Sequence, residues 1–335
     1  MYHSKISGLG YYVPENIVTN DDLSKLMDTN DEWIQERTGI KERRHVIRGE
    51  DTTTSMGVKA AEIAIKRANV AKEDIDFVIF ATLSPDYYFP GPGVLVQRDL
   101  GLKTVGALDV RNQCSGFVYA ISIADQYIKT GMYKNILVIG SEVHSTGLDM
   151  TDRGRGVSVI FGDGAGAAVL SREEDLSKGI LSTHLHSEGQ HAEELALIAP
   201  GMGKRWITDV IADNDPNDES YYPYMNGQFV FKNAVVRFSE VINEGLQANN
   251  LQVSDINMLV PHQANLRISQ FIQQKFKLAD DQVYNNIMKY GNTTAASIPI
   301  ALTEAWEQGK IKSGDLVVLA AFGSGFTWGS VIIRW

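Results

Sequence analysis

The sequence contains one cysteine, Cys114, at a position where its thiol could act as a nucleophile. The chain around it passes from the apolar run 105–110 into an apolar-periodic stretch, which predicts a strand followed by a helix. A thiol at a helix N-terminus feels the positive end of the helix dipole, which favours the thiolate, and the free backbone N–H groups there can stabilise an oxyanion. The alternative is a buried structural cysteine, the usual role of a lone thiol.

Two further polar residues follow apolar segments in the second half of the chain. His262 comes directly after the apolar run 256–260, and α/β proteins place ligand chemistry at such strand ends. The alternative is a hydrogen-bonded core histidine. Asn292 lies between Gly291 and Thr293, which is also compatible with a simple Gly-Asn turn. The same segment matches a glycosylation sequon, which we discount for a chain expected in the cytosol.

Three other groupings suggest different chemistry but lack the full pattern. His184 and His186 would share one strand face with His191 nearby, yet no carboxylate or thiol set accompanies them, so no metal site is predicted. The glycine-rich run 162–166 lacks the spacing of a dinucleotide fingerprint, and close backbone packing explains it better. The polar run 213–220 lacks the glycine and glutamate that a calcium loop needs, and is predicted to be a solvated loop.

Short apolar runs alternate with helical patterns along the whole chain. A helix with one apolar face is predicted over 233–249, because apolar residues recur there at steps of three and four. The glycine-rich run 322–326 comes straight after a predicted strand and could bring a backbone N–H to a ligand. Strands alternating with helices indicate α/β layers. The predicted strands, each too short for a helix, are 75–80, 105–110, 135–139, 256–260 and 315–321.

The chain also repeats itself weakly. The helix at 55–69 leads through Ala-Asn-Val to an Asp-Ile-Asp segment and a strand, and the helix at 233–249 leads through Ala-Asn-Asn to Asp-Ile-Asn and a strand, at an offset of 181. The alternative is chance similarity between ordinary α/β units. Duplication predicts two similar halves, residues 1–172 carrying the cysteine and residues 173–335 carrying His262 and Asn292, packed into one pseudo-symmetric fold.

Length and composition limit the class of protein. The 335 residues are 44% hydrophobic and 21% charged, which is typical of a globular chain. The net charge of −10 argues against a nucleic-acid partner. A single cysteine allows no intrachain disulfide, the first residues lack the apolar core of a signal peptide, and no apolar run approaches the length of a membrane span. We therefore expect a cytoplasmic protein with no membrane association.

Cys114, His262 and Asn292 are more specific together than singly, and with their flanking segments they resemble one family. The chain resembles β-ketoacyl-acyl-carrier-protein synthase III, a condensing enzyme of the thiolase superfamily, over nearly its whole length. The segments that carry the resemblance are 30–40, the stretch around Cys114, 152–154, 161–168, 261–265, 291–293 and 326–329. The resemblance implies a duplicated, five-layered α/β/α/β/α thiolase-like fold, usually a homodimer, which agrees with the repeat.

The resemblance also implies a mechanism, a decarboxylative Claisen condensation that initiates fatty-acid synthesis. Cys114 would take the acyl group from acyl-CoA, with the backbone N–H groups of Cys114 and Ser324 as oxyanion hole. His262 and Asn292 would then donate hydrogen bonds to the thioester carbonyl of malonyl-acyl-carrier protein and stabilise the enolate left by loss of CO₂. The products would be β-ketoacyl-acyl-carrier protein, CoA and CO₂, and no cofactor or metal is expected.

Other roles are implied position by position. The residues concerned match the family's contacts to CoA (Trp33, Arg37, Arg153 and Asn265), its acyl pocket (Phe322, and Phe89, which lines the pocket of the partner subunit), and its basic docking positions for the acidic carrier protein (Lys232, Arg267 and Lys275). Judged without the resemblance, the three basic residues would be expected on an ordinary solvated surface.

Two departures from the family pattern keep the substrate open. The separation of 148 residues between Cys114 and His262 is longer than in well-known members, with the extra length around 200–228, and Ser324 stands where many members have Gly. Alternatives are therefore a related synthase or acyltransferase of specialised metabolism that uses a longer, branched or aromatic acyl-thioester, and a non-catalytic acyl-thioester-binding scaffold.

Overall fold

The computed structural model describes residues 2–201, 215 and 218–335, and its strands form two large sheets and two small ones. The first large sheet has the order β1 (His3–Tyr12), β7 (Gly164–Glu173), β6 (Asn135–Glu142), β4 (Phe77–Ala81) and β5 (Gly106–Val110). The second has the order β8 (Gly179–Ser187), β13 (Thr327–Arg334), β12 (Leu316–Gly323) and β11 (Met258–Pro261). The small sheets pair β2 (Ile17–Thr19) with β3 (Glu42–Arg44), and β9 (Leu195–Ala196) with β10 (Tyr224–Met225).

The two large sheets share one topology. In the first, β7 is antiparallel to both β1 and β6, and β6 is parallel to β4. In the second, β13 is antiparallel to both β8 and β12, and β12 is parallel to β11. The first sheet adds one more parallel strand, β5. The same order and the same directions occur twice, as a duplicated α/β fold requires.

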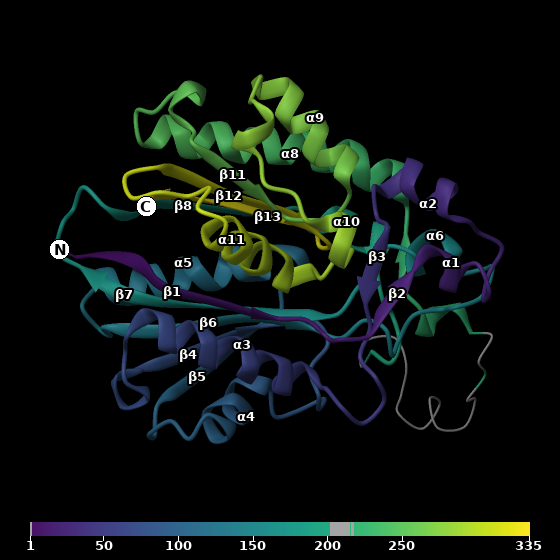
Figure 1. The fold of residues 1–335 in the computed structure, drawn as a ribbon, viewed down its shortest axis with the longest axis horizontal. Coiled ribbons are helices and arrows are strands. Elements are labelled where there is room, and N and C mark those ends of the chain that lie inside the picture. The colour runs from purple at the N-terminus through teal and green to yellow at the C-terminus, as the bar shows by residue number, and fades with distance from the viewer. Residues whose placement is uncertain (1, 202–214, 216–217) are drawn as a thin grey trace.

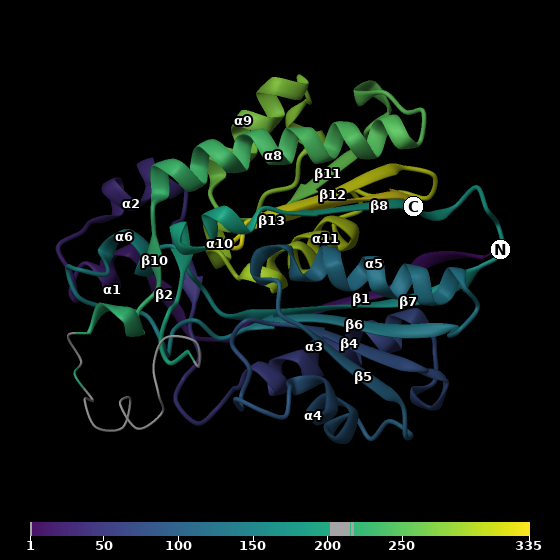
Figure 2. The same ribbon diagram turned by 180° about the vertical axis from the view of Figure 1, so that it is seen from behind.

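Helices cover both sheets and fill the space between them, which makes five layers (Figures 1 and 2). The outer layer on the first sheet is α3 (Thr53–Ala68) and α4 (Pro92–Asp99), the central layer is α5 (Gly116–Lys129) and α11 (Ser297–Glu307), and the outer layer on the second sheet is α8 (Gly227–Ala248) and α9 (Leu266–Phe276). The short helices are α1 (Asn20–Leu23), α2 (Asp31–Thr38), α6 (Arg155–Ser158) and α10 (Ile287–Tyr290). The predicted thiolase-like α/β/α/β/α fold is confirmed.

The apolar core follows these layers. The largest cluster lies between the sheets, where Ile121 of α5 and Leu302 of α11 pack among buried strand residues. A second cluster holds α8 and α9 on the outer face of the second sheet, and a third holds α3 on the first. A sheet packs against each side of the central helix layer. This packing fixes the starts of α5 and α11 relative to the neighbouring strand ends.

Helix ends agree with local capping signals. The predicted helix 55–69 is α3, which begins after Thr52 in a capping box with Ser55 and ends at Asn69, in the left-handed conformation. The predicted helix 233–249 is α8, but it starts earlier, at Gly227. The reason is the N-cap Asn226, whose side chain accepts the N–H of Phe229 at 3.3 Å.

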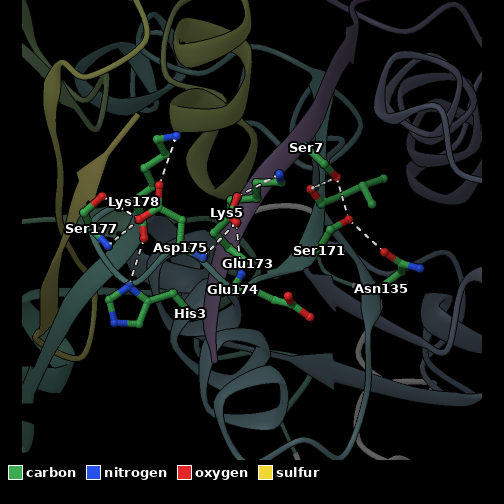
Figure 3. Close-up of polar contacts among 11 residues, drawn as sticks. His3, Lys5, Ser7, Asn135, Ser171, Glu173, Glu174, Asp175, Ser177 and Lys178 are labelled. Atoms are coloured by element: carbon green, nitrogen blue, oxygen red, sulfur yellow. Dashed lines mark hydrogen bonds and ion pairs between the residues drawn. The ribbon is translucent and has the colours of Figure 1, made fainter. Parts of the chain in front are cut away.

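Polar contacts fasten the first strand to β7 and to the turn that leads into β8 (Figure 3). Lys5 pairs with Glu173 at 2.8 Å, and the Ser7 hydroxyl contacts that of Ser171 at 2.8 Å. The ring of His3 contacts the carbonyl of Lys178 at 2.9 Å. Partly exposed ion pairs add little stability, so these contacts mainly fix the path of the chain between the two sheets. No helix in the described part of the chain could span a membrane.

Candidate active site

Cys114 lies at the junction between β5 and α5. It is the middle residue of a short 3₁₀ turn, Gln113–Ser115, that leads into α5, and Gln113 there has a left-handed φ of 43°. The thiol is buried beneath the end of β12. A Cβ on Gly323 would lie 2.6 Å from Cβ of Cys114, so only glycine permits this approach. The predicted strand-to-helix position of the cysteine is correct.

The protonation state of the thiol differs from the prediction. Burial, with a smaller contribution from the nearby Glu142 carboxylate, raises the pKa of Cys114 to about 12. Hydrogen bonds from its own N–H, from the Thr294 hydroxyl and from the N–H of Ser324 act in the opposite direction but are outweighed. The expectation that the helix N-terminus keeps this sulfur ionised is therefore wrong, because desolvation exceeds the local dipoles. The nucleophile begins as a neutral thiol.

Glu142 is a second buried acid beside the cysteine. It ends β6, and its carboxylate accepts hydrogen bonds from the Thr82 and Ser84 hydroxyls at 2.9 and 2.6 Å and from the N–H of Leu83 at 3.2 Å. Burial raises its pKa to about 7 despite these donors. The carboxylate clamps the ends of β4 and β6 together, and its charge opposes ionisation of the thiol.

His262 follows β11 directly, at the predicted strand end. Its Nδ1 contacts the Ser297 hydroxyl at 2.6 Å, and that hydroxyl receives the N–H of Gln263 at 3.4 Å, so Ser297 is set to donate to Nδ1. The proton then sits on Nε2, which has no hydrogen-bond partner among the described residues. Burial lowers the pKa of His262 to about 3. The ring is thus a neutral donor, a role that a core histidine with both nitrogens satisfied would not offer.

Asn292 is held by its backbone and by one side-chain oxygen. Its N–H donates to the carbonyl of Ile160 at 2.8 Å, and its own carbonyl accepts from Gly162 at 3.1 Å. The side-chain Oδ1 accepts the N–H of Thr294 at 2.8 Å. With Oδ1 engaged, the amide NH₂ is the end of the side chain that remains to donate. The glycine-rich run 162–166 therefore supports the site by close backbone packing, as expected.

One cavity of about 610 Å³ brings the three residues together. Its wall includes Cys114, His262 and Asn292, although they lie on three separate segments of the chain. Of the other predicted residues, its wall also contains Trp33, Arg37, Asn265, Phe322, Lys232 and Arg267. The Arg37 guanidinium lies 4.4 Å from the centre of the Trp33 ring. The same cavity thus contains a nucleophile, two hydrogen-bond donors and the stacked side chains of Trp33 and Arg37.

Four predicted residues are not in the wall of this cavity. Arg153 bonds the Asp149 carboxylate at 2.6 Å and lies 4.8 Å from the ring of Tyr222, so it lines a neighbouring pocket. Phe89 is 82% exposed, so it does not line the acyl cavity of its own chain. Lys275 lies in the last turn of α9. The backbone N–H of Ser324 acts to lower the pKa of the Cys114 thiol, while its hydroxyl donates to the carbonyl of Leu195.

Two other features singled out in the sequence are the histidine cluster and the polar loop. His184 and His186 do share a strand, β8, and both contact Glu244, at 3.4 and 2.6 Å. Within the described residues, however, no set of three or more His, Cys, Asp or Glu side chains could hold a metal ion. The part of the extra segment that covers 202–214 and 216–217, and with it half of the predicted polar loop 213–220, lies outside the described residues.

Sequence reasoning missed several groups that shape the site. Ser297 sets the tautomer of His262, the Thr294 hydroxyl acts to lower the pKa of the thiol, and Arg155 lies over Trp33 at 5.1 Å. The only sequence signal was the polar run that follows Asn292, which resembles an ordinary turn.

Comparisons with known proteins agree with this geometry. A family model described as 3-oxoacyl-[acyl-carrier-protein (ACP)] synthase III matches residues 108–189, and one described as the C-terminal part of the same enzyme matches residues 246–335. The β-ketoacyl-[acyl-carrier-protein] synthase III of Sulfurimonas denitrificans is 44% identical over 99% of this chain and 98% of its own length. This chain belongs to the synthase III family. The protein of that name from Serratia proteamaculans is 46% identical over 99% of both chains.

Solved structures support membership of the synthase III family. The crystal structure of 3-oxoacyl-[acyl-carrier-protein] synthase III from Aquifex aeolicus aligns with a TM-score of 0.90 at 44% identity, covering 99% of this chain and 100% of that one. The priming β-ketosynthase of the R1128 polyketide pathway aligns with a TM-score of 0.88 at 30% identity, covering 99% and 96%. The prediction of an acyl-transferring condensing enzyme is confirmed.

Proposed function

We propose that this synthase III catalyses decarboxylative Claisen condensation of an acyl-CoA primer with malonyl-acyl-carrier protein, the step that initiates fatty-acid synthesis. The observation that carries the proposal is the shared cavity of Cys114, His262 and Asn292, with one thiol and two neutral donors. The chemistry uses the protein's own groups, with acyl-CoA and malonyl-acyl-carrier protein as substrates and no cofactor.

In the first half-reaction the acyl group moves from CoA to Cys114. The sulfur attacks the thioester carbonyl, and the N–H groups of Cys114 and Ser324, both of which act to lower the pKa of the thiol, stabilise the oxyanion. The carbon–sulfur bond to CoA breaks, the proton lost by the Cys114 thiol ends on the departing sulfur, and CoA leaves as a thiol. An acyl-Cys114 thioester remains, with its chain directed toward Phe322 and the other apolar residues of the wall.

In the second half-reaction malonyl-acyl-carrier protein places its thioester carbonyl against His262 and Asn292. Nε2 of His262 and the Asn292 amide each donate one hydrogen bond to this oxygen. The bond to the carboxylate breaks, CO₂ leaves, and the electron pair forms an enolate whose charge both donors stabilise. The enolate carbon attacks acyl-Cys114, and the released sulfur takes a proton from solvent. Neutral donors suit this step because each has its proton in place before charge appears.

Charged and flat groups around the opening serve the two large substrates. Trp33 and Arg37 bind the adenine of CoA by stacking, with Arg153 and Asn265 as further CoA contacts. Lys232 and Arg267 at the cavity wall, with Lys275 beyond it on α9, bind the acidic carrier protein. A local cationic surface makes this contact possible despite the net charge of −10.

The assembly and location follow from the same proposal. Phe89 is exposed beside Tyr87 and Tyr88, which are 52% and 65% exposed, and large aromatic side chains gathered in this way indicate a protein interface. We infer a homodimer in which Phe89 enters the acyl pocket of the partner. Residues 1–172 and 173–335 are its two duplicated halves, and the enzyme works in the cytoplasm.

A second candidate is a related synthase that takes a longer, branched or aromatic acyl group. The specific observation is the likeness to the polyketide priming β-ketosynthase, together with an apolar cavity of about 610 Å³. The chemistry on Cys114 is the same in both cases, and only the acyl chain differs. A non-catalytic scaffold is disfavoured, because it would have no use for a buried thiol facing two unsatisfied donors.

Intact-protein mass spectrometry tests the proposal. After mixing with a panel of acyl-CoA thioesters, the wild-type enzyme should gain one acyl adduct, Cys114→Ala should gain none, and the best chain identifies the primer. His262→Ala and Asn292→Ala should still form the adduct but lose condensation with malonyl-acyl-carrier protein by about 10²-fold or more. Normal condensation in both variants would contradict the assigned roles, and absence of any wild-type adduct would favour a scaffold.

A further inference from the structure

The side chain of Gln263 joins the two segments that carry the donors of the second half-reaction. Gln263 follows His262 in the chain, is buried, and does not belong to the wall of the cavity. Its side-chain Nε2 donates to the carbonyl of Pro261 at 2.8 Å and to that of Tyr284 at 3.3 Å. One amide therefore bonds both the end of β11 and a separate segment of the chain that follows α9.

The oxygen of the same amide caps the short helix α10. Oε1 of Gln263 accepts the N–H of Asn286 at 3.0 Å and that of Ile287 at 3.1 Å. These are the N-cap and the first residue of α10, and the side chain of the N-cap makes no capping hydrogen bond. The free N–H groups at a helix start need an acceptor. Here the acceptor comes from the residue that follows the end of β11.

The helix that Gln263 caps leads directly to Asn292. It is a single turn that ends at Gly291, in the left-handed region with a φ of 64°. The N–H of Gly291 donates to the carbonyl of Ile287 at 2.9 Å. Ile287 is thus bonded to Gln263 through its N–H and to Gly291 through its carbonyl. One helical turn therefore separates the Gln263 amide from the residue before Asn292.

These contacts use the whole hydrogen-bonding capacity of the Gln263 amide. A carboxamide has two N–H donors and an oxygen with two lone pairs, and all four are engaged. Glu304 also holds α10, by accepting from the Asn286 amide and the Tyr290 hydroxyl, both at 2.8 Å. Those bonds bring α10 to α11, whereas the Gln263 amide brings it to the end of β11.

We propose that Gln263 is a positioning residue that sets the distance between His262 and Asn292, so that both can donate to one thioester oxygen. This inference rests on the proposed function and deepens its second half-reaction. Both donors must lie within about 3 Å of the same oxygen, although they come from separate segments. A displacement of about 1 Å at a reacting centre slows a reaction by about 10²-fold, so the link between the segments affects the rate.

The two half-reactions depend on this link to different extents. Acyl transfer uses the backbone N–H groups of Cys114 and Ser324, which lie on segments that the Gln263 amide does not bond. Condensation uses both side-chain donors at the same time. Loss of the link therefore lowers condensation and leaves acylation close to the wild-type rate. General damage to the fold would lower both rates together.

Gln263→Met tests the link, because methionine has a similar length but no N–H donor and only a weak acceptor. Condensation of the acylated enzyme with malonyl-acyl-carrier protein should fall by about tenfold or more. Acylation of Cys114, followed by intact mass, should stay close to the wild-type rate. Gln263→Glu keeps an acceptor for the two N–H groups of α10 but lacks the amide N–H donors. It should show the same selective loss, and it provides the test if Gln263→Met does not fold.

A double variant tests whether Gln263 acts through the pair of donors. In Asn292→Ala only His262 remains to donate, so the relative position of the two residues no longer matters. Adding Gln263→Met to this variant should therefore slow condensation by a smaller factor than it does in the wild type. An equal factor in the two backgrounds would mean that Gln263 does not act by aligning the donors, and would overturn the inference.

Gln282→Met is the matched control. The Gln282 amide also joins two segments, since Nε2 donates to the carbonyl of Ile256, just before β11, at 2.6 Å and Oε1 accepts the N–H of Ala279 at 2.9 Å. This variant should acylate and condense like the wild type. If the wild type itself gives no condensation product, the proposed function fails. If the wild type condenses and Gln263→Met condenses equally fast, or loses acylation to the same extent as condensation, only the positioning role is overturned.

Discussion

The reacting residues of this site are neutral before catalysis, and burial is the cause. Burial raises the pKa of the Cys114 thiol to about 12 and lowers that of the His262 ring to about 3. Charge therefore appears only during the reaction, as a thiolate, an oxyanion or an enolate, and always beside donors that are already oriented. Such donors are worth more in a dry cavity than in water, because no solvent must reorganise around the new charge. The orientation of each donor is thus as important as its identity.

Ser297 is the residue on which the orientation of His262 depends. Ser297→Ala removes the hydroxyl that donates to Nδ1, so the proton can move to that nitrogen and Nε2 loses its donor role. We expect condensation to fall about tenfold or more while acylation of Cys114 is unchanged, as measured by product formation and by adduct mass.

The matched control is Ser269→Ala, because Ser269 is also buried but its hydroxyl has no partner among the described residues. That variant should condense at the wild-type rate. If Ser297→Ala also condenses normally, another group must hold the tautomer.

At the scale of elements, the site is built where the two halves of the fold present corresponding ends. Cys114 lies between β5 and α5, and His262 directly follows β11. The buried central helices bring the starts of α5 and α11 against the ends of strands from both sheets. Because β12 ends at Gly323, directly over Cys114, the backbone of the second half completes the surroundings of the nucleophile of the first. Neither half contains the site alone.

Gly323 tests how closely the two halves must approach. Gly323→Ala would place a Cβ 2.6 Å from that of Cys114 and 3.2 Å from its sulfur, so the turn or the strand end must shift. We expect acylation to slow by about 10²-fold, because a displacement of about 1 Å at a reacting centre has this effect, with the fold retained by circular dichroism. Gly189→Ala is the control, since a Cβ there meets nothing within 4 Å. Equal rates in the two variants would contradict the tight approach.

The elements could be predicted from sequence better than the contacts between them. The strand at 135–139 and the helix around Val241 follow from local apolar patterns, which tertiary packing preserved. The hydrogen bond between His144 and Thr294 joins residues 150 positions apart, and no local pattern reports such a contact. The protonation state of the thiol was predicted wrongly for the same reason. A local sequence pattern predicts the start of a helix and hence its dipole, but desolvation depends on the whole surrounding core.

At the scale of the whole molecule, the buried neutral histidines link the stability of the fold to pH. Burial lowers the pKa of His45, His144 and His262, whereas in the unfolded chain each titrates near its ordinary value of 6.5. Below about pH 6.5 the unfolded chain therefore binds more protons on these histidines than the folded chain does, and the free energy of unfolding decreases as the pH falls. Glu142 acts in the opposite sense, because its raised pKa of about 7 lets the folded chain bind one proton first.

We therefore expect the free energy of unfolding to decrease between about pH 6.5 and pH 4.5. Three histidines against one glutamate leave up to two protons taken up on unfolding, which corresponds to a slope of roughly 3 kcal/mol per pH unit at most. Urea unfolding followed by tryptophan fluorescence at several pH values measures that slope. His144→Gln should reduce it by about one proton. A constant unfolding free energy over this range would mean that the folded enzyme protonates these rings freely, and the neutral donor at His262 would then lose its physical basis.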